Sequence, residues 1–207
     1  MQVQKKSSIR ERNIEQILLA AEQVFADRGY AGARMSDIAQ AAALPRSNVH
    51  YYFSTKQQLY REVLFGLLEL WKQDALCFEL YDDPRVVLTT YIRAKMNRSR
   101  TRPAGSRVWA SEIMHRAPVL GDALEEHLVG WARMKEARIA SWVAEGRISP
   151  VAPAHLLFMV WSATQHYADF DYQIELINND TPLSDHQFEL AVHTVTQVIL
   201  RGVGLST

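Results

Sequence analysis

Residues 36–60 read SDIAQAAALPRSNVHYYFSTKQQLY, and this stretch decides how the N-terminal part of the chain is predicted to fold. The Leu-Pro pair at 44–45 separates two short helical patterns, because the residue before a proline is pushed out of the α region. The proline can itself open a new helix, since a first turn leaves its N–H unpaired in any case. The stretch therefore predicts one short helix, capped by Ser36 and ending near Ala42, and a second over 46–52.

The second short helix begins with polar side chains. Two short helices joined by a tight turn form a helix-turn-helix, whose second helix lies in the DNA major groove with its first residues against base edges. Arg46 can bond guanine or a phosphate, and Asn48 can bond adenine. Ser47 is a candidate for a phosphate contact and His50 is a further exposed candidate. The pattern indicates a segment that binds double-stranded DNA.

Three aromatic residues, Tyr51, Tyr52 and Phe53, close the same helix. A tyrosine ring can pack while its hydroxyl reaches a phosphate, and Tyr51 and Tyr52 are adjacent on a helix, so at least one of them is expected to point outward. Phe53 is expected in the core. The alternative interpretation is a generic helical hairpin in which all three rings serve only as core.

Apolar residues at helical spacing extend on both sides of this segment. Before it they predict a helix over 9–28 that stops at Gly29. After it, further helices are expected over 56–80, 84–101, 105–116, 119–145, 153–178 and 184–203, with prolines near the junctions. The predicted class is all-α, with about nine helices. A three-helix helix-turn-helix domain is expected over 1–55 and a helical effector-binding and dimerisation domain over 56–207.

Composition limits the other possibilities. The chain has 207 residues, 48% of them hydrophobic and 22% charged, which is ordinary usage for a globular protein. No apolar run is long enough for a membrane span, and the N-terminus lacks the apolar core of a signal peptide, so we expect a cytoplasmic protein without a membrane partner. The single cysteine, Cys77, can form neither an internal disulfide nor a thiolate metal site and is expected to be a core residue.

Charge is distributed unevenly although the net charge is zero. Residues 1–56 contain eight basic and five acidic side chains, so this part carries three positive charges and the remainder three negative ones. A basic N-terminal part suits contact with phosphates, because neutralising them needs local rather than global charge. An excess of three charges is also within sampling variation, so the motif and not the charge supports DNA binding.

Two groups of polar residues have spacings that metals can use: His155 with His166 and Asp169, and His186 with Glu189 and His193. Neither has the His-x-x-x-His spacing of a strong metal motif, and helical histidines are more often surface or interface residues. The sequence also lacks a nucleophile elbow and a phosphate-binding glycine loop. It therefore predicts no catalytic residue, no metal site, no cofactor and no enzymatic activity.

Residues 14–60, IEQILLAAEQVFADRGYAGARMSDIAQAAALPRSNVHYYFSTKQQLY, resemble the DNA-binding domain of the TetR family of one-component regulators. The resemblance rests on the Ala-Ala-x-x-x-Phe pattern, the Gly-Tyr-x-Gly turn and Tyr-Tyr-Phe followed by STKQQLY. It implies that Lys56 opens a fourth helix and contacts phosphate, with Arg34 and Ser36 as further candidates at the DNA. Between the two short helices, Ala43 and Pro45 replace the family's usual Gly and Ser, which removes the residue best suited to a positive φ and a side-chain cap.

Later segments resemble one branch of that family, the RutR-type regulators of pyrimidine utilisation. They are SRVWASEIMHRAPVL (106–120), HLLFMVWSATQHYADF (155–170) and the Trp-Val-x-x-Gly-x-Ile-x-Pro-Val stretch over 142–151. The resemblance implies a homodimer through the last two helices that binds operator DNA, acts as a repressor and is released by a small effector, uracil or thymine first. The alternatives are an unrelated apolar or aromatic effector, or a helical binding protein that no longer reads DNA.

A pyrimidine-sized site needs an aromatic or apolar wall and a few polar partners, because an unpaired buried polar edge costs about 1–3 kcal/mol. Trp161 and Gln165 are four residues apart on one helical face and supply a stacking ring and an amide. The other polar candidates for the effector site are Glu112, Tyr167, Asp169, Ser99 and Arg100. Each has a structural alternative, such as plain core for Trp161 or an ion pair with an arginine for Glu112.

Overall fold

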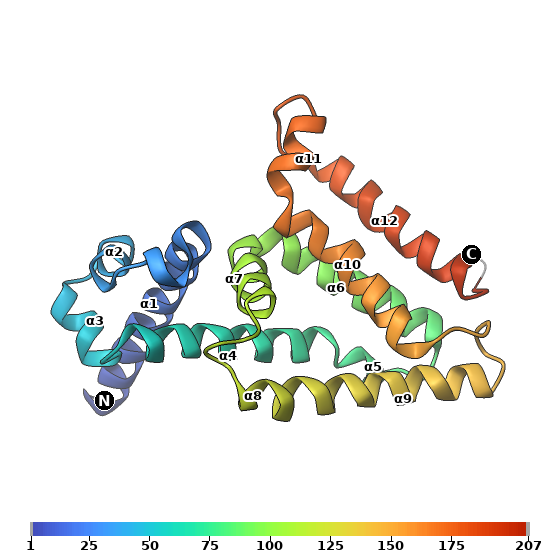
Figure 1. Cartoon of the computed structure of the whole chain (residues 1–207), viewed down its shortest axis with the longest axis horizontal. Coiled ribbons are helices and arrows are strands. Elements are labelled where there is room, and N and C mark those ends of the chain that lie inside the picture. The colour runs from blue at the N-terminus through green and yellow to red at the C-terminus, as the bar shows by residue number, and fades with distance from the viewer. Residues whose placement is uncertain (1, 206–207) are drawn as a thin grey trace. The chain divides into compact units, whose positions relative to one another are not determined.

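The computed structural model describes residues 2–205, and all regular structure in that range is helical (Figure 1). The helices are α1 (Gln2–Gly32), α2 (Met35–Ala41), α3 (Arg46–Tyr52), α4 (Lys56–Asp74), α5 (Cys77–Leu80), α6 (Pro84–Thr101), α7 (Pro103–Met114), α8 (Asp122–Leu124), the π-helical η1 (Glu125–Val129), α9 (Gly130–Ala144), α10 (Pro153–Asp169), α11 (Asp171–Ile177) and α12 (Asp185–Gly202). The predicted all-α class is confirmed.

The chain forms two compact units. The N-terminal unit comprises residues up to 68 together with 107–121, and the C-terminal unit comprises 69–106 together with the residues from 122 onward. Both α4 and α7 therefore contribute residues to each unit. In the N-terminal unit the residues of α4 and α7 join the core of the first three helices through Tyr60, Leu64 and Trp109, all of which are buried.

Several predicted helix bounds need correction. The single helix expected over 56–80 breaks at Ala75 and Leu76 into α4 and α5, and the one expected over 153–178 breaks at Phe170, whose φ of −124° and ψ of 31° leave the helical region. The stretch expected as 119–145 contains η1. Apolar spacing continues across these breaks, so periodicity alone does not reveal them.

The predicted stop at Gly29 is a kink within α1. Gly29 has φ of 66° and ψ of 168°, and helical residues resume as far as Gly32. A positive φ costs glycine little because it has no Cβ, so the chain changes direction here without strain. The helix also starts earlier than predicted, at Gln2 rather than near residue 9.

The turn between α2 and α3 closes by the hydrogen bonds of a Schellman motif. The Leu44 N–H donates to the Ala39 carbonyl and the Ala43 N–H to the Gln40 carbonyl, each at 3.0 Å. Ala43 adopts a φ of 49°, so an alanine occupies the left-handed position that glycine usually takes. The turn geometry survives the Gly-to-Ala departure, at the cost of backbone strain.

The predicted cap of α2 is wrong. Arg34 occupies the N-cap position and makes no side-chain capping bond, while Ser36 is the second residue of the helix. Asp37 does lie in the first turn, where it pairs with Arg28. Pro45 takes the N-cap position of α3, which likewise has no side-chain cap.

We expect Ala43→Gly to stabilise the N-terminal unit by about 0.5–1 kcal/mol, because relief of the left-handed strain of roughly 1–2 kcal/mol exceeds the entropy that glycine adds to the unfolded chain. Thermal and urea unfolding measure the change. Ala41→Gly, in the last turn of α2, is the matched control and should destabilise. If Ala43→Gly also destabilises, the turn does not carry the strain that its φ indicates.

The core of the C-terminal unit lies among α6, α10 and α12, each of which contacts the other two. Figure 1 shows α10 lying across α6, with α12 beside it. Leu88, Ile92 and Met96 of α6 are buried there. Burial also raises the pKa of the Cys77 thiol to about 11, which suits the inert core position predicted for it.

The end of α12 packs against the turn at Ser149, whose N–H donates to the Val203 carbonyl at 2.8 Å. Gly204 follows with a φ of 78°, and a Cβ added there would collide with the Ser149 Oγ. We expect Gly204→Ala to lower the free energy of unfolding by about 1–2 kcal/mol, because left-handed strain is added and the Ser149 Oγ has to rotate away from the new Cβ.

Two further variants separate these causes in the same unfolding experiment. Ser149→Ala combined with Gly204→Ala removes the Oγ and should recover part of the loss. Gly202→Ala lies in α12 with open space around its Cβ position and should stabilise slightly. A Gly204→Ala protein that melts like the wild type would contradict this account of the turn.

Candidate functional site

The exposed surface of α3 consists of polar residues around one buried anchor. Val49 is fully buried, whereas Arg46, Ser47 and His50 are exposed. The Arg46 Nε donates weakly to the His50 Nε2 at 3.4 Å, which aligns the two side chains along the helix. The predicted DNA-contacting residues on the first turn of α3 therefore reach solvent together, except that Asn48 is half-buried.

The two tyrosines of α3 differ in solvent exposure. The Tyr51 side chain is 80% exposed, whereas Tyr52 is half-buried and its hydroxyl accepts a bond from the Asn13 amide at 3.2 Å. Their rings meet edge to face at 5.1 Å. Phe53 is buried. The expectation that one tyrosine points outward and that Phe53 joins the core is confirmed, and Tyr51 has the more accessible hydroxyl.

Lys56 is occupied by the turn that follows α1. Its Nζ donates to the carbonyls of Tyr30, Ala31 and Ala33 at 2.7, 3.4 and 3.0 Å and lies 4.5 Å from the Tyr30 ring centre. An ammonium has three N–H groups, so these carbonyls use all of them. In this conformation Lys56 holds the entry to α2 in place, and a phosphate contact would require it to exchange one of these bonds. Arg34 and Ser36, at the start of α2, are both exposed.

The predicted effector residues do not all lie together. Glu112 belongs to the N-terminal unit, where it is buried and accepts the N–H groups of Val119 and Leu120 at 2.8 and 2.9 Å. It also accepts the Tyr60 hydroxyl, and burial together with this carboxylate raises the pKa of Tyr60. Glu112 therefore connects the turn over 115–121 to Tyr60 of α4. These contacts favour a structural role for Glu112 over effector binding.

Trp161 and Gln165 are both half-buried on α10, as their spacing predicted. The Trp161 Nε1 donates to the hydroxyl of the buried Tyr91 on α6 at 2.8 Å. The Trp161 ring stacks on Trp131 of α9 with centres 6.2 Å apart. Burial raises the pKa of Tyr91, so its hydroxyl keeps a proton to donate.

Three other predicted residues line a cavity of about 250 Å³ among α6, α10, α11 and the start of α12: Ser99, Arg100 and Tyr167. Ser99 donates to the Thr164 carbonyl at 2.7 Å, while Arg100 pairs with Asp185 and lies 4.7 Å from the Phe188 ring centre. Asp169 accepts the Ser106 hydroxyl at 2.6 Å.

Lys95 lies beside the predicted effector residues but was not itself predicted from the sequence. It lies on α6 one turn from Tyr91 and one turn from Ser99, with 7% of its surface exposed. Its Nζ packs over the Trp71 ring at 4.9 Å and forms no hydrogen bond or ion pair to another described residue. Burial lowers its pKa to about 8, against the opposing pull of Asp74 and Asp169. No pattern in the sequence around Lys95 indicates this burial, because the ring that covers its Nζ, Trp71, comes from another helix.

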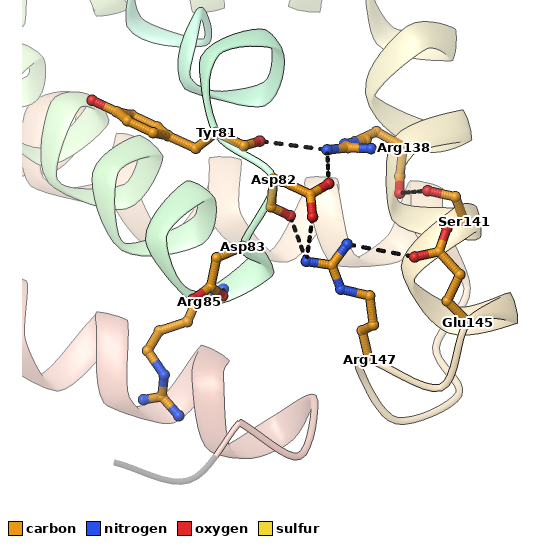
Figure 2. Close-up of polar contacts among 8 residues, drawn as sticks. All are labelled: Tyr81, Asp82, Asp83, Arg85, Arg138, Ser141, Glu145 and Arg147. Atoms are coloured by element: carbon orange, nitrogen blue, oxygen red, sulfur yellow. Dashed lines mark hydrogen bonds and ion pairs between the residues drawn. The ribbon is translucent and has the colours of Figure 1, made fainter.

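Charged residues join the loop before α6 to the end of α9, as Figure 2 shows. Asp82 accepts Arg138 at 2.7 Å and Arg147 at 3.0 Å, and the two arginines also bond the Tyr81 and Asp82 carbonyls. Hydrogen bonds from Arg147 and then Arg138 lower the pKa of Asp82. Elsewhere Glu189, weighed above as a metal ligand, binds Arg93 through both oxygens, at 3.2 and 3.0 Å.

Two models of one protein family match consecutive parts of the chain. Residues 17–63 match the model described as bacterial regulatory proteins, tetR family, and residues 64–206 match the model of the YcdC-like protein, C-terminal region. The chain therefore belongs to the TetR family of bacterial transcriptional regulators. This agrees with the prediction that it is a DNA-binding regulator and not an enzyme.

Among individual relatives, the HTH-type transcriptional regulator RutR of Escherichia coli (strain K12) is 37% identical over 187 residues, covering 90% of this chain and 88% of RutR. The predicted RutR-like resemblance is thus confirmed. The fold is also that of AibR in complex with isovaleryl coenzyme A and operator DNA (TM-score 0.68, 20% identity, 88% and 96% of the chains). A TetR family regulator from Marinobacter aquaeolei VT8 is similar in fold (TM-score 0.66, 18% identity, 95% and 97%). In the described range no helix is long and apolar enough to cross a bilayer.

Proposed function

We propose that this TetR-family regulator is a homodimeric repressor whose operator binding is released by a small planar molecule rich in carbonyl groups, with uracil or thymine as the first candidates. The observation that carries the proposal is Lys95, a lysine of α6 that is only 7% exposed and whose Nζ lies over the Trp71 ring at 4.9 Å. A largely desolvated ammonium is stabilised by a hydrogen-bond acceptor, so a ligand carbonyl is its natural complement.

The surroundings of Lys95 suit a flat polar ring. Trp71 offers an aromatic face at 4.9 Å from the Nζ, and Tyr91, one turn away, has a hydroxyl hydrogen to donate. Contacts of α6 with α10 bring the Trp161 and Gln165 face to the same part of the unit. Uracil presents two carbonyl oxygens to such donors and two N–H groups to an amide oxygen such as that of Gln165.

Exposed apolar side chains support a homodimer through the last helices. Phe158 and Met159 of α10, Tyr172 and Ile177 of α11, and Leu190 and Val198 of α12 are each at least half exposed. Leu190 and Val198 are exposed on α12, whereas Phe188 and Val192 of the same helix face the core. An apolar surface on three neighbouring elements is typical of an interface, and a two-fold dimer places two α3 helices on one operator.

Operator release tests the proposal directly. Duplex DNA selected from random sequences by the full-length protein is labelled, and its fluorescence anisotropy is followed with uracil, thymine, cytosine, benzoate and a medium-chain fatty acid. We expect uracil or thymine to reduce the fraction of bound DNA and to raise the melting temperature of the free protein. Release by the fatty acid alone would favour an unrelated effector. Failure to select any DNA would favour a helical binding protein that no longer reads an operator.

A further inference from the structure

A second cavity, of about 510 Å³, lies in the C-terminal unit; none of the residues predicted for the effector lines it, although its Trp131 ring stacks on Trp161. One wall consists of the end of α4 and of α5, with Leu76 and Glu79. The opposite wall consists of η1 and the start of α9, with Trp131 and Met134. The cavity therefore combines an aromatic ring and aliphatic side chains with a charged rim.

Trp131 lines this cavity, and the buried Lys135 lies one turn further along α9, where it pairs with Glu79 of the opposite wall. The Trp131 Nε1 is buried and has no hydrogen-bond partner in the described part of the chain. Lys135 is 2% exposed, and its ion pair with the Glu79 Oε1 is long, at 3.5 Å. Its Nζ otherwise faces the rings of Trp131 and Phe78 at 5.3 and 5.7 Å. A buried donor without an acceptor is rare in native proteins, so the Trp131 N–H indicates a missing partner, and Lys135 can exchange its long ion pair for a better acceptor.

Glu79 is a weak partner for Lys135. Its side chain is 62% exposed, so water competes for the carboxylate. Helix α5, which carries Glu79, is nevertheless held in position. Asp82 in the loop after α5 pairs with Arg138 of α9 and with Arg147 in the turn after α9 (Figure 2). A ligand can therefore displace the Glu79 carboxylate while α5 and α9 stay where they are.

We infer that this cavity binds a small carboxylate with an aromatic or apolar body. One carboxylate oxygen takes the place of the Glu79 oxygen at Lys135, and the other accepts the Trp131 N–H. The body of the ligand packs against Leu76, Met134 and the Trp131 ring. The site is built from α5 and α9, and it adjoins the proposed pyrimidine site, because Trp131 stacks on Trp161 of α10.

Calorimetric titration of the full-length protein with benzoate tests this site, with benzamide as the uncharged analogue. We expect one benzoate to bind per chain and benzamide to bind at least tenfold more weakly. Lys135→Met should weaken benzoate binding about tenfold or more, because a charge-assisted hydrogen bond is lost. Trp131→Phe should weaken it by a smaller factor, since only a neutral donor is removed.

The decisive variant is Glu79→Gln, which removes the competitor for Lys135 and should tighten benzoate binding several-fold. A gain in affinity cannot come from a damaged fold. Glu62→Gln and Arg133→Met change exposed charges on α4 and α9 outside the cavity and should alter the affinity less than about twofold. The inference is overturned if benzoate does not bind, if benzamide binds equally well, or if Glu79→Gln weakens binding.

Discussion

Lys95→Met should make the protein more stable and at the same time unresponsive to its effector. Burial lowers the pKa of Lys95 from 10.5 to about 8, which corresponds to roughly 3 kcal/mol of penalty for the charged form. Methionine has a similar length and no charge to desolvate, so we expect the free energy of unfolding to rise by about 1–3 kcal/mol at pH 7. The variant also lacks the donor proposed for a ligand carbonyl, which should weaken effector binding by about tenfold to a hundredfold.

The pH dependence has a definite sign. The unfolded chain binds the Lys95 proton more tightly than the folded one, so the penalty is full below about pH 8 and disappears as the pH rises toward 10.5. The wild type should therefore gain stability over this range relative to Lys95→Met. Urea unfolding at pH 7 and pH 9.5 measures the difference.

Lys72→Met is the matched control, because Lys72 is partly exposed and pairs with Glu69. It should change neither the unfolding free energy nor its pH dependence by more than about 0.5 kcal/mol. A Lys95→Met protein that is less stable than the wild type would show that the ammonium has a partner within the fold. Unchanged uracil or thymine binding in this variant would remove Lys95 from the effector site.

Arg46→Ala should weaken operator binding by about 1–3 kcal/mol, or roughly tenfold to a hundredfold, without changing effector affinity. Arg46 is exposed on the first turn of α3, and only its weak bond to His50 has to be given up when it meets DNA. Because Arg46 lies outside the buried core, the loss should not be accompanied by unfolding.

The salt dependence of the same binding measurement distinguishes a phosphate contact from a base contact. Loss of a phosphate contact should weaken binding to all sequences alike and lower the salt slope by about one, whereas loss of a guanine contact should relax specificity at one position. Arg93→Ala, an exposed arginine of the C-terminal unit, is the control and should bind the operator normally. An Arg46→Ala protein that binds like the wild type would remove Arg46 from the DNA interface.

Local sequence signals were reliable for the DNA-binding segment. Helix α3 has the predicted bounds, one of the two adjacent tyrosines points outward as predicted, and Phe53 is buried as predicted. All three depend on backbone rules that act over a few residues. The position of the Lys56 ammonium did not follow from such rules, because its partners are the carbonyls of Tyr30, Ala31 and Ala33, some 25 residues earlier.

The effector residues were less predictable because they come from several helices. Trp161 and Gln165 share a face of α10 as predicted, but Glu112 belongs to the other unit and is held by Val119 and Leu120. Spacing along one helix says which residues share a face. It does not say which face of another helix meets them.

The sequence by itself determined the all-α class, the helix-turn-helix and the family, since these depend on apolar period, proline and glycine positions and motif residues close in the chain. Only the tertiary structure decided which charged side chains are buried and desolvated. Lys95 and Lys135 look like ordinary helical lysines in the sequence, and both are buried beside aromatic rings from other helices. Desolvation depends on everything packed around a group, so no local pattern contains it.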